Sequence, residues 1–216
     1  PASLSLDLDN LWTYMKTAGI AGWETFPSYL DLVTPRILDR LDHHGLKITF
    51  FIVGQDAALK ENRQALRRIA EAGHEIANHS FHHEPWLSRS SREAMSAEIA
   101  QAEDAIGDAS GQRTIGFRGP SFCLSTPLLE TLCERGYEYD ASTLPTFLGP
   151  LARAYYFTRS DLSAEERKKR SLLFGSLADG LRPINPYEWN LSTGRMVEIP
   201  VTTTPLIRAP FHLTYL

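Results

Sequence analysis

The densest group of reactive side chains in the sequence is the run His79-Ser-Phe-His-His83, with three histidines in five positions. His79 and His83 are four residues apart, so one turn of helix would place both imidazoles on the same face. Two such nitrogens are a pair of ligands for a divalent metal, provided that a third ligand comes from elsewhere. The alternative is a polar loop whose histidines are solvated or bonded to backbone carbonyls.

Residues 2–9 alternate between apolar and polar side chains, which predicts a strand. Asp7 and Asp9 then point to the same side near its end. Two carboxylates at this spacing repel each other, and one would have a raised pKa unless a cation lies nearby. The pair therefore indicates a metal or an arginine, while an exposed edge strand or a simple turn at Asp9 is the alternative.

Apolar patterns predict alternating strands and helices up to residue 140. Further strands are expected at 47–53, 74–78, 114–118 and 137–140, and helices at 28–44, 65–73, 90–106 and 125–136. This alternation favours parallel strands joined by right-handed crossovers, with an active site at the C-terminal strand ends. Four of these ends carry Asp9, His79, Arg118 and Asp140.

Two segments lack this alternation. Residues 10–27 are expected to form a loop rich in aromatic side chains, among them Trp12, which suggests a lining surface. Residues from about 142 to 195 are expected to be an insertion or cap with one clear helix at 163–174. A sixth strand is expected at 197–201, and residues 1–216 are interpreted as a single domain.

The overall composition narrows the classes of partner. The 216 residues are 43% hydrophobic, and a net charge of -4 with a pI near 6.0 predicts no nucleic-acid partner. No apolar run approaches the ~20 residues needed to span a bilayer, and no signal sequence is recognisable, so we expect a cytoplasmic location. Two cysteines are too few for a disulfide framework.

Asp9 completes a possible ligand set with His79 and His83. Two histidines and one carboxylate with open positions suit catalytic Zn²⁺, while Fe, Co or Mn would also fit. The metalloprotease pattern H-E-x-x-H is excluded because Ser80 stands where its glutamate base would be. A base must come from elsewhere, and Asp7 is the candidate. Arg118 could pair with Asp7 and keep it ionised.

Four motifs, in this order, resemble those of the polysaccharide deacetylase family, which shares the NodB homology domain and is grouped with carbohydrate esterase family 4. They are Asp7-Leu-Asp9, His79-Ser-Phe-His-His83, Arg118-Gly-Pro120 and Asp140. The second is the most specific. The resemblance covers residues 3–140 and implies an α/β fold, a distorted (β/α) barrel with fewer than eight complete units. It also implies hydrolysis of N-acyl groups, usually acetyl, from amino sugars in chitin, peptidoglycan or other surface glycans.

The resemblance further implies a role for each matching residue. Asp9, His79 and His83 would hold the metal, Asp7 would be the general base, and Arg118 would orient it. The remaining expected site residues are the backbone N–H of Ser121 as oxyanion donor, Asp140 tuning a histidine acid, His212 as that acid, and Trp12, Pro120 and Phe122 as substrate contacts.

The sequence departs from the family pattern at several points. Leu8 separates two aspartates that are usually adjacent, and Ser121 stands where tyrosine is usual. The late Leu-x-His motif is not recognisable, so His212 is the candidate only because it is the sole histidine after residue 83. A final barrel strand is not recognisable either, which suggests truncation or a strand supplied by another chain. A homo-oligomer is compatible with this pattern.

Two other functions remain open from the sequence. A cyclic amide hydrolase of the allantoinase type resembles this family in fold and can act without metal on a small intracellular substrate. A non-catalytic carbohydrate-binding protein would keep the scaffold and bind sugar without turnover. The intact ligand positions favour a metal-dependent N-acyl hydrolase over both.

Overall fold

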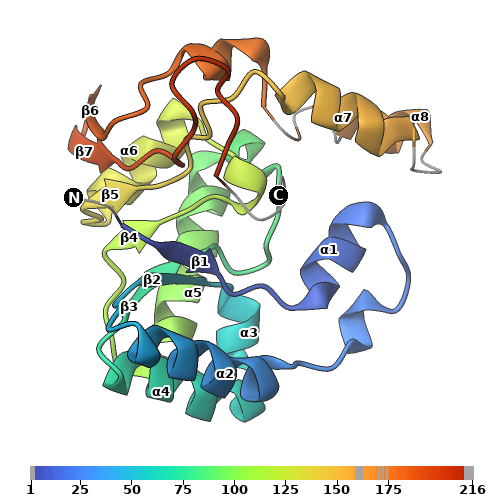
Figure 1. The fold of residues 1–216 in the computed structure, drawn as a ribbon. Helices are drawn as coiled ribbons and strands as arrows, with labels where there is room; N and C mark the ends of the chain where they lie inside the picture. Colours follow the sequence, from blue (N-terminus) through green and yellow to red (C-terminus); the bar gives the residue numbers. More distant parts are fainter. Residues whose placement is uncertain (1–2, 159–162, 170, 172, 174, 212–216) are drawn as a thin grey trace. The chain divides into compact units, whose positions relative to one another are not determined.

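The computed structural model describes residues 3–158, 163–169, 171, 173 and 175–211 (Figure 1). The chain divides into two compact units. Unit 1 comprises Pro1–Glu84 and Ser96–Arg118, and unit 2 comprises Pro85–Met95 and Gly119–Leu216. Both units combine parallel strands with helices, so the predicted α/β class is confirmed. The prediction of a single domain with an insertion at about 142–195 stays a prediction.

The strands of unit 1 form a parallel sheet. Its strands are β1 (Ser5–Asp7), β2 (Thr49–Ile52), β3 (Glu75–Asn78) and β4 (Gly116–Phe117), hydrogen-bonded in that order. Phe50 pairs in register with Leu6 on one side and Ile76 on the other. Phe50, Phe51 and Ile52 are all buried. The unbroken apolar run therefore forms a central strand with both faces covered, as predicted.

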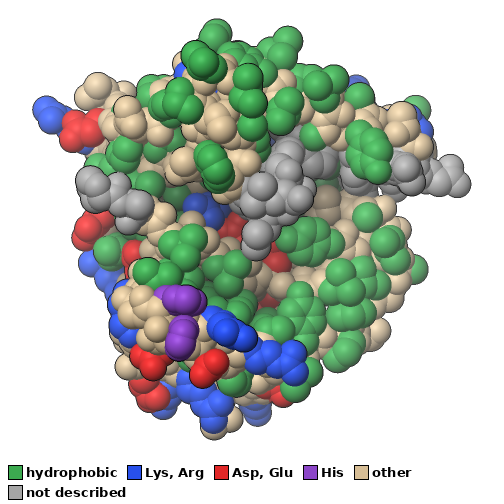
Figure 2. Space-filling view, viewed as in Figure 1, with side chains coloured by type: hydrophobic (Ala, Val, Ile, Leu, Met, Phe, Trp, Pro, Cys, Tyr) green, Lys and Arg blue, Asp and Glu red, His purple; other side chains and the backbone are tan. Residues whose placement is uncertain are grey.

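Helices on unit 1 complete its core. They are α2 (Leu30–His43), α3 (Gly54–Ala58), α4 (Arg63–Glu71) and α5 (Arg92–Ser110), which begins in unit 2. Leu30, Leu66 and Ile106 pack into one buried cluster with Phe50 and Ile76. The outer faces of α2 and α4 are charged, and Figure 2 shows these side chains gathered at the surface. This amphipathic division is typical of helices that cover a sheet.

The expectation of a loop at residues 10–27 is wrong. This segment contains α1 (Leu11–Ala18) and the short 3₁₀ helix η1 (Trp23–Thr25). Gly19 ends α1 in the left-handed conformation, with φ 74°. Packing stabilises the segment, because Trp12 is buried and its ring centroid lies 5.9 Å from that of Trp23. Trp12 therefore anchors the segment by packing, which a period-based pattern did not predict.

Unit 2 contains a β-hairpin that the sequence analysis missed. The strands of unit 2 are β5 (Tyr139–Asp140), β6 (Tyr187–Leu191) and β7 (Gly194–Glu198). The hairpin consists of β6 and β7, which are antiparallel, while β5 is parallel to β7. The helices α6 (Thr126–Glu134), α7 (Gly149–Thr158) and α8 (Ala164–Lys169) belong to the same unit. The strand expected at 197–201 begins earlier and ends at Glu198, two residues before Pro200. Alternating side chains in β6, followed by a tight turn, were the available signal.

Among the described residues, no helix is both long enough and apolar enough to cross a membrane.

Candidate metal centre

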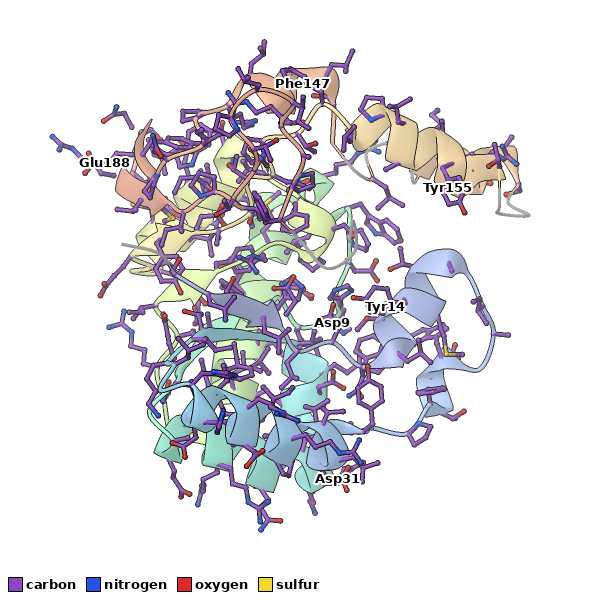
Figure 3. All side chains as sticks on the ribbon, viewed as in Figure 1. Asp9, Tyr14, Asp31, Phe147, Tyr155 and Glu188 are labelled. Carbon is purple, nitrogen blue, oxygen red and sulfur yellow. The ribbon has the colours of Figure 1, made fainter. Side chains whose placement is uncertain are left out.

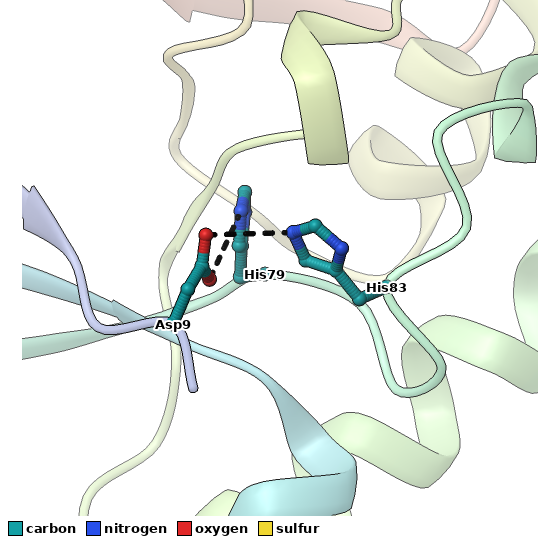
Figure 4. Close-up of side chains that lie close together, drawn as sticks. All are labelled: Asp9, His79 and His83. Carbon is teal, nitrogen blue, oxygen red and sulfur yellow. Dashed lines mark ion pairs between the residues drawn. The ribbon is translucent and has the colours of Figure 1, made fainter. Parts of the chain in front are cut away.

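The three predicted metal ligands lie together in unit 1 (Figure 4). His79 Nε2 lies 3.8 Å from Asp9 Oδ1, and His83 Nε2 lies 3.6 Å from Asp9 Oδ2. Asp9 follows β1 and His79 follows β3, and both strands pair in parallel with β2. The C-terminal ends of parallel strands meet at one edge of a sheet, so the topology accounts for this convergence.

The turn that carries both histidines is not helical, which corrects the expectation drawn from their spacing. Ser80 and His83 have φ values of 62° and 53°, in the left-handed region that few residues other than glycine adopt. The Ser80 N–H donates to Asn78 Oδ1 at 2.7 Å, and the His83 N–H donates to Ser80 Oγ at 3.2 Å. The buried serine of H-S-x-x-H therefore holds the turn in shape. The His79 and His83 ring centroids are 5.0 Å apart.

Hydrogen bonding sets the tautomer of His79. Its Nδ1 lies 2.6 Å from the carbonyl oxygen of Arg118, so Nδ1 carries the proton and donates. Nε2, the nitrogen on the side of Asp9, then has a free lone pair. Burial lowers the pKa of His79, which also favours the neutral form that binds metals.

Asp9 has the electrostatic properties of a cation ligand. Burial on its own would raise its pKa, but the interaction with His83 above all outweighs burial and lowers the pKa to about 2. Its Oδ1 is buried and has no hydrogen-bond partner among the described residues. Tyr14, on α1, lies near Asp9 (Figure 3) and further lowers the pKa of this carboxyl group.

The observed spacing fits a metal ion. Ligand atoms bound to one ion at about 2.0–2.2 Å lie roughly 3–4 Å from each other, which matches the separations of 3.6 and 3.8 Å. The unpartnered Asp9 oxygen and the two ring nitrogens supply the donor types that such an ion requires. Asp9, His79 and His83 could therefore hold a divalent metal.

Asp7 and Arg118 form the predicted ion pair beside this group. Arg118 Nη1 donates to Asp7 Oδ1 at 2.6 Å, and Nη2 donates to Ser5 Oγ at 2.9 Å. The guanidinium lies 4.1 Å from the centroid of the Phe51 ring and is buried. The same arginine accepts the His79 ring proton through its carbonyl. Arg118 therefore links the candidate base to a candidate ligand.

His82 is not part of the ligand group. Its side chain is 47% exposed, and its Nδ1 lies 2.6 Å from Glu98 Oε2. The other oxygen of Glu98 accepts the N–H groups of Phe81 and His82 at 3.0 and 2.6 Å. Glu98 therefore supports the histidine turn from α5, a role that no sequence pattern had indicated.

Trp12 differs from the expectation of a substrate contact. It is 4% exposed, and its indole N–H donates to Asp56 Oδ1 at 2.9 Å. A ring held in this way has little free surface on which a sugar could stack. We therefore interpret Trp12 as part of the packing behind the ligand group.

The remaining candidate residues belong to unit 2 or lie outside the description. Pro120 is buried, while Ser121 is exposed with φ 53° and Phe122 is half-buried with φ 59°. These two left-handed residues make a sharp turn after Arg118-Gly119. His212 lies outside the described residues. The roles expected for these residues stay predictions.

Asp140 lies in a buried pair of acids. Its carboxyl accepts hydrogen bonds from the backbone N–H and the hydroxyl of Ser142 at 3.0 and 2.7 Å. Burial, followed by the negative charge of Glu198 and a hydrogen bond with it, raises the pKa of Asp140 well above its ordinary value. Glu198 accepts from Thr143 N–H and Trp189 Nε1. The sequence analysis singled out Asp140 but missed Glu198.

About half of the chain is similar in sequence to known proteins. Residues 22–139, just over half of the chain, match the sequence model of a family described as polysaccharide deacetylase. A chitooligosaccharide deacetylase of Sinorhizobium fredii is 35% identical over 104 residues, which cover 48% of this chain and 47% of that protein. A peptidoglycan-N-acetylglucosamine deacetylase of Bacillus cereus is 35% identical over 97 residues, covering 44% and 34%. The chain therefore spans less than half the length of these relatives.

Solved structures show the same fold. A crystal structure from Mycobacterium smegmatis, described as that of a polysaccharide deacetylase, has a TM-score of 0.66 at 24% identity and covers 93% of this chain and 58% of its own. A mutant of BA3943, a carbohydrate esterase family 4 pseudoenzyme of Bacillus anthracis, has a TM-score of 0.51 at 20% identity, with 73% and 50% covered. The predicted fold class is confirmed, and the pseudoenzyme shows that this fold alone does not establish activity.

Proposed function

The chain belongs to the polysaccharide deacetylase family, and we propose that it is a hydrolase that removes an N-acetyl group from an amino sugar in a surface glycan or its precursor. One observation carries the proposal: Asp9, His79 and His83 form a possible metal site beside the Asp7–Arg118 ion pair. The family match begins at residue 22, after both aspartates. Their convergence with the histidines in space is thus support that the family match does not provide.

Zn²⁺ is the proposed metal, because two imidazole nitrogens and one carboxylate oxygen are its usual catalytic ligands; Fe, Co and Mn are alternatives. A bound divalent ion would polarise the acyl carbonyl and lower the pKa of a water molecule. The protein holds both histidine Nε2 atoms and the Asp9 carboxylate toward one point, and the Arg118 carbonyl keeps His79 in the required tautomer.

Asp7 is the proposed general base. Arg118 Nη1 donates to its Oδ1, which fixes the orientation of the carboxylate. Oδ2 is then the oxygen that takes the proton from the attacking water. The Asp7 side chain is 19% exposed, so solvent and substrate can reach it.

The oxyanion donor and the acid are proposed from the family pattern. The backbone N–H of Ser121 would stabilise the tetrahedral oxyanion, a type of interaction worth ~3 kcal/mol. The exposed, left-handed conformation of Ser121 supports an accessible N–H. A histidine, with His212 as the candidate, would protonate the leaving amine, since an amide nitrogen leaves poorly without a proton. Asp140 is proposed to act on that histidine.

The substrate class follows from the names of the relatives. They are named for chitooligosaccharides and for peptidoglycan N-acetylglucosamine, which share the N-acetylglucosamine unit. We propose this unit as the substrate. No finding favours a cyclic amide substrate or supports a cytoplasmic location, so neither is part of the proposal.

Metal analysis combined with an acetate-release assay tests the proposal. Purified wild-type protein should contain about one divalent metal per chain and release acetate from N-acetylglucosamine oligomers. His79→Ala should lose both properties. The matched control is Gln112→Ala, which removes two hydrogen bonds to the backbone of His74 and Ile76, at the opposite end of β3 from His79.

Two results would contradict the proposal in different ways. Full activity in His79→Ala would refute the metal mechanism. Sugar binding by a metal-loaded wild type without acetate release would establish the non-catalytic reading, as in a pseudoenzyme.

A further inference from the structure

The short helix α3 binds the turn that carries the two histidines. The Gly54 N–H donates to the carbonyl of Ser80 at 2.8 Å, and the Gln55 N–H donates to that of Phe81 at 3.0 Å. Both acceptors lie between His79 and His83 in the sequence. The first residues of α3 therefore fix the backbone of the histidine turn.

This contact is close enough to require glycine. A Cβ atom on Gly54 would lie 2.7 Å from Phe81 Cδ2 and 2.8 Å from the Cα of Ala102. No side chain fits at such distances without displacement of the backbone of α5 or of the turn. The position of α3 relative to the histidines is therefore tightly set.

The next residue of α3 reaches the segment that carries the third ligand. Asp56 Oδ1 accepts hydrogen bonds from Asn10 Nδ2 at 2.8 Å and Trp12 Nε1 at 2.9 Å. Asn10 directly follows Asp9, and all three side chains in this network are buried. Tyr29 holds the same segment, since its hydroxyl donates to the Asp9 carbonyl and its N–H to Asn10 Oδ1.

A carboxyl group in this position needs an explanation. Asp56 is fully buried, and no ion pair with lysine or arginine is found for it among the described residues. Its Oδ2 has no hydrogen-bond partner in the described part of the chain. Burial raises its pKa to about 6 even though Trp12 and Asn10 stabilise the ionised form. Such a group is costly for packing, because an apolar side chain would fill the space without desolvating a charge.

We propose that Asp56 is a positioning residue, which through Asn10 and Trp12 holds Asp9 opposite the histidine turn. Three consecutive residues, Gly54 to Asp56, then join the two chain segments that supply the ligands. The inference rests on the metal site in the proposed function. Asp56 does not touch the metal; it limits how far Asp9 can move from the histidines, and so raises the affinity for the ion.

Binding of Co²⁺ to the purified full chain tests this role without reference to activity. Asp56→Ala should weaken Co²⁺ affinity by ~10–100-fold, the usual effect of losing a residue that orients a ligand, and should alter the visible absorption of the bound ion. Asp56→Asn retains a side-chain oxygen for Asn10 and Trp12, so its loss should stay below ~10-fold. Gln112→Ala also removes two hydrogen bonds and should leave affinity and spectrum unchanged.

The outcomes separate the two proposals. If wild type binds neither Co²⁺ nor Zn²⁺, the metal site and this inference both fail. If wild type binds and Asp56→Ala matches it in affinity and spectrum, only the role of Asp56 is refuted. A loss in Asp56→Asn as large as in Asp56→Ala would refute the hydrogen-bonding role. Should Asp56→Ala fail to fold, Trp12→Phe decides, because it removes one donor and should weaken binding; unchanged binding would overturn the inference.

Discussion

Two buried carboxyl groups in this protein, Asp9 in unit 1 and Asp140 in unit 2, have pKa values displaced in opposite directions. Burial raises the pKa of both. Attraction to His83 outweighs burial at Asp9 and lowers its pKa to about 2, whereas the negative Glu198 raises that of Asp140 further. The sign of the neighbouring charge, and not burial, decides which group is ionised. Asp9 is suited to bind a cation and Asp140 to retain a proton.

The hydrogen bonds show the same contrast. Asp140 receives two from Ser142, so the protein itself satisfies its oxygens. Asp9 Oδ1 has no hydrogen-bond partner among the described residues, although it is buried. A polar atom buried without a partner costs ~1–3 kcal/mol. The hydrogen bonds of Asp140 are complete as the protein folds, whereas the cluster around Asp9 would gain stability from a bound cation.

The largest effect is expected from Asp9→Ala. The variant should bind no metal at stoichiometric concentration, and acetate release should fall to the level of the blank, because two histidines alone do not complete the site. Metal content after dialysis and acetate release measure this. Retained metal in the variant would mean that Asp9 is not the ligand, and would remove the basis for contrasting it with Asp140.

Asp7→Asn should lower kcat/KM by ~10²–10⁴-fold, the usual contribution of a positioned general base. Metal content should stay at the wild-type level, since Asp7 is bonded to Arg118 and not to the ligands. A variant with normal activity would show that another group takes the proton.

Arg118→Lys should have a smaller effect. Lysine keeps the charge but cannot donate to Asp7 and Ser5 at once in the geometry of the guanidinium. Loss of one hydrogen bond to a charged group costs ~1.5–3 kcal/mol, so kcat/KM should fall roughly 10–150-fold. Steady-state kinetics at saturating metal are the measurement. If Arg118→Lys and Arg118→Ala lose the same amount of kcat/KM, a positive charge at this position is not sufficient for Asp7 to act as the base.

Glu198→Gln should change how stability depends on pH. The folded protein holds a proton on Asp140 that the unfolded chain releases, so the free energy of unfolding falls as pH rises from the unfolded pKa, about 3.9, through the raised folded pKa. Glutamine removes the negative neighbour and lowers the folded pKa. The fall should therefore shrink by ~1.4 kcal/mol for each pKa unit removed, as measured by urea unfolding at several pH values.

Asp9→Asn in metal-free protein is the matched contrast. The folded pKa of Asp9 is below its unfolded value, so its contribution to stability is present above about pH 4 and is lost as pH falls through about 2. The two variants should thus alter the pH dependence with opposite signs. If both variants change the pH dependence of stability in the same direction, the explanation of the two pKa shifts by the neighbouring charges is refuted.

Much of unit 1 was predictable because its signals are local. The apolar run around Phe50 predicted a buried strand, and Gly73 marked the end of the helix that follows this strand, α4. His79 and His83, which the H-S-x-x-H motif singled out among the three histidines of the run, lie in one cluster with Asp9. Their geometry was predicted wrongly, since the motif forms a turn with left-handed residues and not a helical turn.

The signals for unit 2 and for the supporting network were weaker. The strand β6 carries alternating residues, but a short alternating run beside several prolines was not distinguished from a loop. Glu198 and Asp56 belong to no motif. Asp56 matters because of Asn10 and Trp12, which are 46 and 44 residues away in the sequence, and no periodicity reports a contact at that separation.

The sequence by itself determined the donor types of the site: two histidines four residues apart, an aspartate after a strand, and an arginine able to pair with Asp7. Residue type and local spacing are encoded within a few positions, so they can be inferred from one chain. Only the tertiary structure decided which oxygen of Asp9 faces which nitrogen, how Arg118 joins Asp7 to His79, and that Asp56 accepts a hydrogen bond from Asn10, next to Asp9. These depend on parallel strand pairing and on hydrogen bonds between segments far apart in the chain, which form only when the core packs.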